Sequence, residues 1–340
     1  MPTILYLLAR ILYNIHLHPL RSYPGPALWA ATRLPWHHAS LRGDLAWTLL
    51  SLHQRHGPVD LCRWYGLMAF DVVSDLAFGQ PAGCLDNADQ PWLQVIGARA
   101  KSIVWFQFAM HYGLDRWMGL VAPKSSIEAR KKHLELTSTN VRRRLEQKED
   151  SDRKDFMSYI LDNEAETLSN KELVLMASSF IVAGSGTSSS ALTATTFFLG
   201  RNPDKYRLLA EEVRSAFVSE AEITIESTSR LSYLKAVIDE GRMESNFRHA
   251  KSFIPERWLP LAKYSEFAND DRSAAQPFSY GPRNCIGQNM AYAEMRLALA
   301  KLFWNFDFEL ADDSNKWLDE QKMYLVWEKT PLMVNLRPRN

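Results

Sequence analysis

Cysteine is scarce in this 340-residue chain, and its three cysteines, Cys62, Cys84 and Cys285, stand far apart. No Cys-x-x-Cys pair occurs. This spacing argues against a disulfide framework and against a structural zinc site. Unpaired cysteines fit a reducing, cytosol-facing environment.

The sequence also lacks an excess of charge of either sign. Its 40 Lys and Arg side chains nearly balance 39 Asp and Glu, and the formal net charge is +1. Nothing in this balance indicates a nucleic-acid partner. With 46% hydrophobic residues, the chain can bury one large core or two smaller ones.

A full-length hydrophobic run is missing from the N-terminus. Residues 1–15 are apolar, but Arg10 interrupts them, and a bilayer span takes about 20 apolar residues. A proline-rich stretch that includes Tyr23-Pro-Gly-Pro follows. We predict an interfacial or clipped hydrophobic helix rather than a clean membrane span.

A second uncharged stretch runs from Leu173 to Gly200. Its centre, residues 185–196, holds eight Ser or Thr residues, which suits a lipid-facing helix poorly. Gly184 and Gly186 each cost about 1 kcal/mol relative to Ala inside a helix. We therefore predict a long helix buried in protein, with a weakened and polar centre.

The rest of the pattern predicts a mainly α chain with a small β portion. Helical patterns cover three segments: the first is apolar, the second is strongly charged and leads into an exposed loop, and the third begins at Asn202-Pro203. The last 20 residues predict a hairpin. These elements are expected at 64–78, 125–149 and 204–217, with hairpin strands at 323–327 and 332–336.

The most informative segment runs from Phe278 to Gly287 and places one cysteine in a loop before a helix. Residues 290–303 lack Gly and Pro, and Ala291, Met295, Ala298 and Leu302 form an apolar stripe at helical spacing. Cys285 should therefore lie at or just before a helix N-terminus, which favours a thiolate. Such a thiolate can be the single axial ligand of an iron.

The neighbours of this cysteine fit a flat, anionic group. Gly281 and Gly287 have no side chains, so such a group could approach the backbone closely. Arg283 offers a fork of donors to a carboxylate such as a porphyrin propionate. The alternative is a buried structural cysteine, as most lone cysteines are.

The complete pattern, Phe-x-x-Gly-x-Arg-x-Cys-x-Gly, resembles the haem-binding loop of the cytochrome P-450 family. The resemblance implies that Cys285 ligates the haem iron, with Phe278 beside the sulfur. It also implies that Arg283 reaches a propionate, and that Gly281 and Gly287 let the loop and helix lie against the porphyrin. The family's haem-thiolate fold follows from the same resemblance.

Residues 183–188 resemble the family's oxygen-binding motif on its long central helix. By this resemblance Ala183 and Gly184 lie at the cofactor, and Thr187 is the catalytic residue that donates a hydrogen bond to dioxygen. The acid expected before this threonine is Gly186 here, so the proton-donor chain lacks a member. Without the cysteine loop, a helix kinked by back-bonding hydroxyls would be the preferred interpretation.

The family's Glu-x-x-Arg pair is one residue short in this chain. Glu240 and Arg242 stand at i and i+2, which do not face each other on a helix. Their usual partner lies in the downstream Pro-Glu-Arg segment, at Arg257. We expect a buried charge to be left without its partner. Glu211 and Arg214 have the family's spacing but read as an ordinary surface pair.

Two segments of the family pattern are absent. One gap lies near 58–59, where a substrate-contact region is expected, and the other near 242–252, where a sheet is expected. We therefore divide the chain into a shortened membrane-anchor and hinge segment, 1–20, and an abridged cytochrome P-450 catalytic domain, 21–340.

The resemblance implies a haem-dependent monooxygenase that inserts one oxygen atom of dioxygen into an apolar small molecule. It implies electrons from an NADPH-dependent flavoprotein reductase, and a place at the cytosolic face of the endoplasmic reticulum membrane. The N-terminal segment is most similar to fungal microsomal members of secondary metabolism. A haem-thiolate isomerase, a peroxide-using enzyme and a non-enzymatic remnant remain alternatives.

Overall fold

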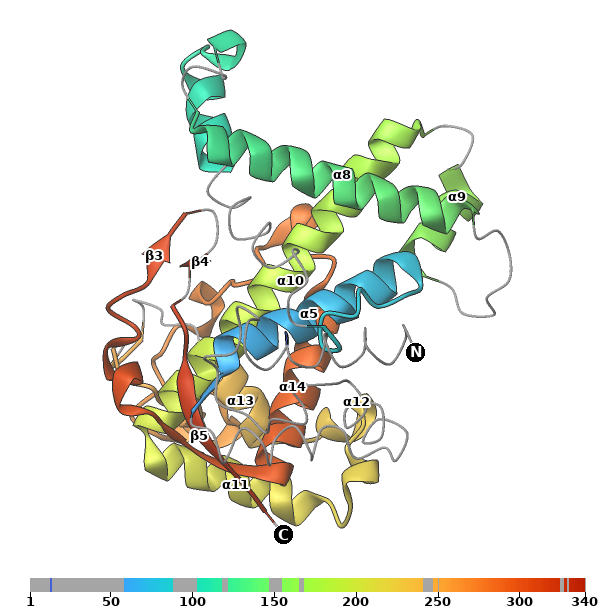
Figure 1. The fold of residues 1–340 in the computed structure, drawn as a ribbon. Coiled ribbons are helices and arrows are strands. Elements are labelled where there is room, and N and C mark those ends of the chain that lie inside the picture. Colours follow the sequence, from blue (N-terminus) through green and yellow to red (C-terminus); the bar gives the residue numbers. More distant parts are fainter. Residues whose placement is uncertain are drawn as a thin grey trace, which may run out of the picture.

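The computed structural model describes residues 13, 58–87, 103–117, 122–146, 155–164, 168–240, 247–249, 251–324, 327–328 and 330–339. These residues are mainly helical, with two small sheets at one side (Figure 1). The predicted fold class is confirmed. The expected anchor, 1–20, lies outside the described residues apart from Tyr13, and so does Arg242.

Helix α10, Asn170–Arg201, is the long uncharged helix that the sequence predicts. A capping box starts it: Ser169 accepts a hydrogen bond from the Glu172 N–H, and the Glu172 carboxylate accepts one from the Ser169 N–H. Among the described residues, α10 is the one helix long and apolar enough to cross a membrane. It instead lies across α5, Leu61–Phe78, and many of its hydroxyls are buried in protein.

The other helices are α8 Lys124–Glu146, α9 Phe156–Glu164, α11 Pro203–Ala216, α12 Ile225–Thr228, α13 Ser232–Glu240 and α14 Gln288–Asn305. Of these, α8, α11, α13 and α14 contact α10, whereas α9 packs on α5 and α12 packs on α14 (Figure 1). Short 3-10 helices include η4 Pro255–Trp258 and η7 Gly281–Arg283. The helix at Asn202-Pro203 begins as predicted, with proline at its first position.

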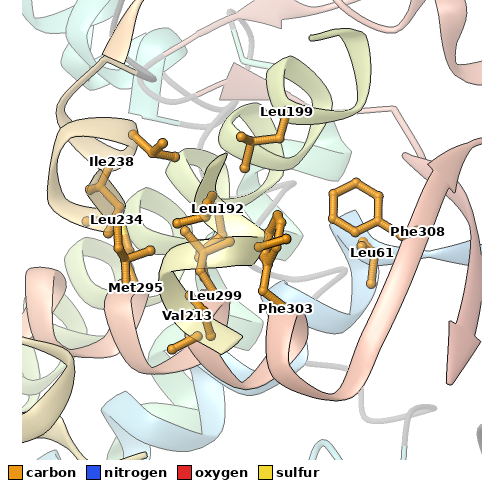
Figure 2. Close-up of a cluster of buried hydrophobic side chains, with 14 of the residues drawn as sticks. Leu61, Leu192, Leu199, Val213, Leu234, Ile238, Met295, Leu299, Phe303 and Phe308 are labelled. Carbon is orange, nitrogen blue, oxygen red and sulfur yellow. The ribbon is translucent and has the colours of Figure 1, made fainter. Parts of the chain in front are cut away.

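The main hydrophobic core joins α10, α11, α13 and α14 with β2, Phe306–Leu310 (Figure 2). Leu192, Leu234, Leu299 and Phe303 are completely buried there. The predicted stripe on α14 is only partly correct, because Leu299 and Phe303 are buried more deeply than Ala298 and Leu302.

The predicted hairpin between 323–327 and 332–336 is wrong. Strand β3, Lys322–Met323, pairs with β4, Trp327–Glu328, so the two ends of the first segment pair with each other. Strand β5, Met333–Pro338, instead lies between β1, Val59–Asp60, and β2 in an antiparallel sheet. The end of the chain is thus tied to residues that immediately precede α5.

Candidate functional site

The cysteine loop is a tight turn that brings its two ends together. The Cys285 N–H donates to the Phe278 carbonyl at 2.8 Å. Between them, Ser279 and Gly281 have φ angles of 62° and 79°. Glycine adopts the second angle without strain, which explains its place in the pattern. The turn leaves Cys285 exposed, so the structure excludes the alternative of a buried structural cysteine.

Helix α14 starts directly behind this loop. Gly287 is its N-cap, and the Cys285 carbonyl accepts a hydrogen bond from the Gln288 N–H at 3.3 Å. Cys285 therefore lies just before a helix N-terminus, as predicted. A Cβ atom at position 287 would stand 3.8 Å from the Cys285 Sγ, an ordinary contact distance.

Phe278 anchors the other end of the loop. Its ring packs on Tyr292 of α14, with the centroids 5.3 Å apart. The Tyr292 hydroxyl donates to Asp239 of α13, and Asp239 also pairs with Lys235. This chain of contacts fixes the loop to two helices, while Arg283 remains exposed.

The predicted oxygen-binding residues lie on an exposed face of α10. The Thr187 hydroxyl donates to the Ala183 carbonyl at 2.6 Å, and both residues are exposed. Gly184 faces α5 instead, because a Cβ atom at this position would stand 2.6 Å from Val73 Cγ2. Gly184 thus allows the close crossing of the two helices, and its contact with a cofactor stays a prediction.

The charge network near Glu240 differs from the expectation. Glu240 lies at the end of α13 and pairs with Arg257 of η4 at 3.1 Å, and Arg257 also pairs with Asp270. The expectation that Glu240 is left without a partner is therefore wrong, because Arg257 itself pairs with it, and Asp270 adds a second carboxylate to Arg257. Burial raises the pKa of Glu240, and hydrogen bonds from Ile254 and Trp258 partly offset this rise.

Arg214 is also not the surface pair that its spacing with Glu211 indicated. It donates to the carbonyls of Phe303 and Phe306 and pairs with Asp307 at 2.6 Å. It thereby connects α11 to the end of α14 and the start of β2. The partners Asp270 and Asp307 carry no sequence signal, because nothing local marks which distant carboxylate an arginine will meet.

The exposed cysteine fits a haem thiolate better than a polydentate metal site. Among the described residues, no group of three or more His, Cys, Asp and Glu side chains could hold a metal ion. Beside Cys285, Ile286 is 95% exposed and Tyr280 is 80% exposed. A single sulfur ligand surrounded by uncovered apolar side chains suits a flat apolar macrocycle with one axial ligand.

Comparison with known proteins decides the family. The family model for cytochrome P-450 matches residues 44–241 and 241–336. The chain belongs to the cytochrome P-450 family. It is 37% identical to cytochrome P-450 monooxygenase alt3 of Alternaria solani, over 98% of this chain and 92% of that protein. It is 36% identical to trichothecene C-15 hydroxylase of Fusarium sporotrichioides, over 83% of this chain and 65% of that protein.

A third relative is averantin hydroxylase of Dothistroma septosporum, 29% identical over 99% of this chain and 90% of that protein. These relatives are fungal monooxygenases and hydroxylases, so this cytochrome P-450 is a haem-dependent oxidoreductase that incorporates oxygen, of the kind used in fungal secondary metabolism. Family membership implies a haem-thiolate iron, dioxygen, a small-molecule substrate and a redox-partner reductase.

Proposed function

We propose that this cytochrome P-450 hydroxylates an apolar small molecule with Cys285 as the axial iron ligand. The exposed Cys285, held by its own N–H bond to Phe278 before α14, carries the proposal. When bound, the haem supplies dioxygen activation and the storage of electrons. The chain's own residues hold this group and control the proton that the reaction needs.

Each proposed residue has a distinct task. Gly281 gives the loop its turn, and Arg283 offers donors to a propionate. Gly287 keeps the start of α14 free of a side chain. On α10, Thr187 presents a hydroxyl that donates its proton to the Ala183 carbonyl. That hydroxyl can turn from the carbonyl to an oxygen atom of the substrate complex.

We also propose that two internal segments of the parent enzyme are missing, near 58–59 and 242–252. The alignment with the alt3 monooxygenase spans 474 positions, whereas this chain has 340 residues. The two matched ranges of the family model also meet at residue 241. Both observations support gaps inside the chain. We further propose that the electrons come from an NADPH-dependent flavoprotein reductase and that the protein works at the cytosolic face of the endoplasmic reticulum membrane.

Gly186 favours a second candidate function. A peroxide user or an isomerase needs no delivered proton, and Gly186 provides no acid where the family carries one. Supplying hydrogen peroxide in place of NADPH and reductase separates the two. If product forms faster with hydrogen peroxide alone than with NADPH and reductase, the second candidate is favoured over the monooxygenase.

A spectroscopic experiment tests the site itself. The purified chain is reduced, exposed to carbon monoxide and scanned for the red-shifted band of a thiolate ligand. We expect Cys285→Ala to lose this band and Cys62→Ala, a change in α5, to keep it. A Cys285→Ala variant with the band intact would reject the assignment. A chain that binds no haem at all would favour a non-enzymatic remnant.

A further inference from the structure

The cysteine loop is linked to a carboxylate on a separate helix. Asp239 of α13 accepts a hydrogen bond from the Tyr292 hydroxyl of α14 at 2.6 Å. The Tyr292 ring packs on Phe278, with the centroids 5.3 Å apart. The Phe278 carbonyl in turn accepts the hydrogen bond from the Cys285 N–H. Three successive contacts therefore connect a side chain of α13 to the cysteine.

Both oxygens of this carboxylate are engaged. The oxygen that does not bond to Tyr292 pairs with the ammonium group of Lys235, four residues earlier on α13. The side chain of Asp239 is 8% exposed, whereas that of Lys235 is 54% exposed. The negative member of the pair thus lies inside the protein and the positive member lies at its surface. Together the two side chains add no net charge beside the loop.

Lys235 also reaches the aromatic ring that carries the link. Its ammonium nitrogen lies 5.6 Å from the centroid of Tyr292, within the range of a cation–π contact. A pocket of about 430 Å³ is lined by these three side chains together with Phe278 and Tyr280 of the loop. The ion pair and the loop therefore border the same pocket. Because Asp239 is buried, salt screens its charge much less than that of an exposed side chain.

The surroundings of a thiolate ligand affect the iron that it binds. The reduction potential of a haem depends on its axial ligand, on burial and on the groups that hold and surround that ligand. A nearby negative charge disfavours the added electron and lowers the potential, whereas a positive charge raises it. The ion pair on α13 can therefore act on the cofactor through charge and through the position of the loop.

We propose that Asp239 is a positioning residue for the cysteine ligand. Its hydrogen bond with Tyr292 fixes the ring on which Phe278 packs, and its pairing with Lys235 keeps the charge beside the loop balanced. The inference rests on the proposed role of Cys285 as the iron ligand. It assigns to α13 a part in setting the potential at which the cofactor is reduced.

Hydrogen exchange tests the positioning in the haem-free chain. Mass spectrometry follows deuterium uptake at the Cys285 amide, whose N–H bonds to the loop. We expect Asp239→Ala and Tyr292→Phe to speed this exchange by about 2- to 10-fold, because each removes the hydrogen bond between the two helices. Asp239→Asn keeps an acceptor for the Tyr292 hydroxyl and should retain the slow exchange.

The amides of α5 serve as the internal reference and should keep their exchange rates in these variants. Unchanged exchange at Cys285 in Asp239→Ala would overturn the inference. Exchange that rises equally in α5 would show a general loss of stability and would overturn it as well.

The reduction potential of the haem-loaded chain tests the charge. Asp239→Asn leaves the positive charge of Lys235 unbalanced and should raise the potential. Lys235→Met leaves the negative charge and should lower it. The double variant restores neutrality and should return toward the potential of the unmodified chain. A merely structural role would shift the potential of both single variants in the same direction.

An exposed ion pair provides the matched controls. Glu226 and Arg230 have the same spacing along the chain, but their side chains are 84% and 76% exposed. Glu226→Gln and Arg230→Met should therefore leave the potential unchanged. Shifts of one sign in Asp239→Asn and Lys235→Met, or no shift in either, would overturn the inference. Absence of the thiolate band in the unmodified chain would instead count against the proposed function, and hydrogen exchange would still decide on Asp239.

Discussion

Arg257 and Glu240 form a buried ion pair, with Nε and Oε2 separated by 3.1 Å and side chains that are 1% and 8% exposed. Asp270 adds a second carboxylate to the same guanidinium. The rings of Phe247 and Phe267 lie about 5 Å from that guanidinium. The pair fastens the segment after the proposed second gap to the end of α13.

We predict that Arg257→Met lowers the free energy of unfolding by about 3–5 kcal/mol, because two buried carboxylates lose their partner. Urea unfolding of the full chain measures this loss. Arg230→Met is the matched control, since Arg230 and its partner Glu226 are 76% and 84% exposed, and it should cost less than about 1 kcal/mol. Equal losses in the two variants would contradict the prediction.

Local sequence signals account for the parts of the site that are built from short segments. The cysteine loop, its position before α14 and the uncharged helix α10 all follow from spacing and turn residues that lie within about 30 positions. The local expectations that failed are those whose real partners lie in distant segments. Strand β5 pairs with β1 across more than 270 positions, and a pattern of alternating residues does not name its partner.

The charge partners show the same limit. The spacing of Glu211 and Arg214 indicated a pair, but Arg214 reaches Asp307 on another element. Likewise Asp270 completes the Arg257 network from a loop with no motif of its own. Side-chain reach across packed elements, rather than spacing along one helix, decides these contacts.

The crossing of α10 and α5 provides a second prediction. Gly184→Ala would place a methyl group 2.6 Å from Val73, and we expect a loss of about 1–3 kcal/mol of unfolding free energy. Val73→Ala should relieve the clash in the double variant. Gly186→Ala has open space and should instead gain about 1 kcal/mol from helix propensity. Thermal unfolding measures both changes. If Gly184→Ala and Gly186→Ala change the stability in the same direction, this interpretation is contradicted.

The two loop glycines should respond differently to alanine. Gly281 has a φ of 79°, so Gly281→Ala should cost about 1–2 kcal/mol even in the haem-free chain. Gly287 has a φ of −84° and only an ordinary contact with Cys285. Gly287→Ala should therefore keep the stability of the haem-free chain and lower its haem content. Unfolding curves and haem absorbance separate the two effects.

The buried acid of α14 predicts a pH dependence of stability. Folding raises the pKa of Glu294 from 4.5 to about 7, so between these values the folded chain holds a proton that the unfolded chain has released. Stability from this group is present below pH 4.5 and is lost as the pH rises toward 7. The total change is about 3 kcal/mol, from about 1.4 kcal/mol per pH unit.

Glu294→Gln removes this titration. The variant should match the haem-free unmodified chain near pH 4.5 and exceed its unfolding free energy by up to about 3 kcal/mol at pH 8. Glu226→Gln, a change at an exposed carboxyl, should keep the original slope. Urea unfolding at several pH values measures the difference. If the Glu294→Gln curve runs parallel to that of the unmodified chain, Glu294 is not a buried neutral acid.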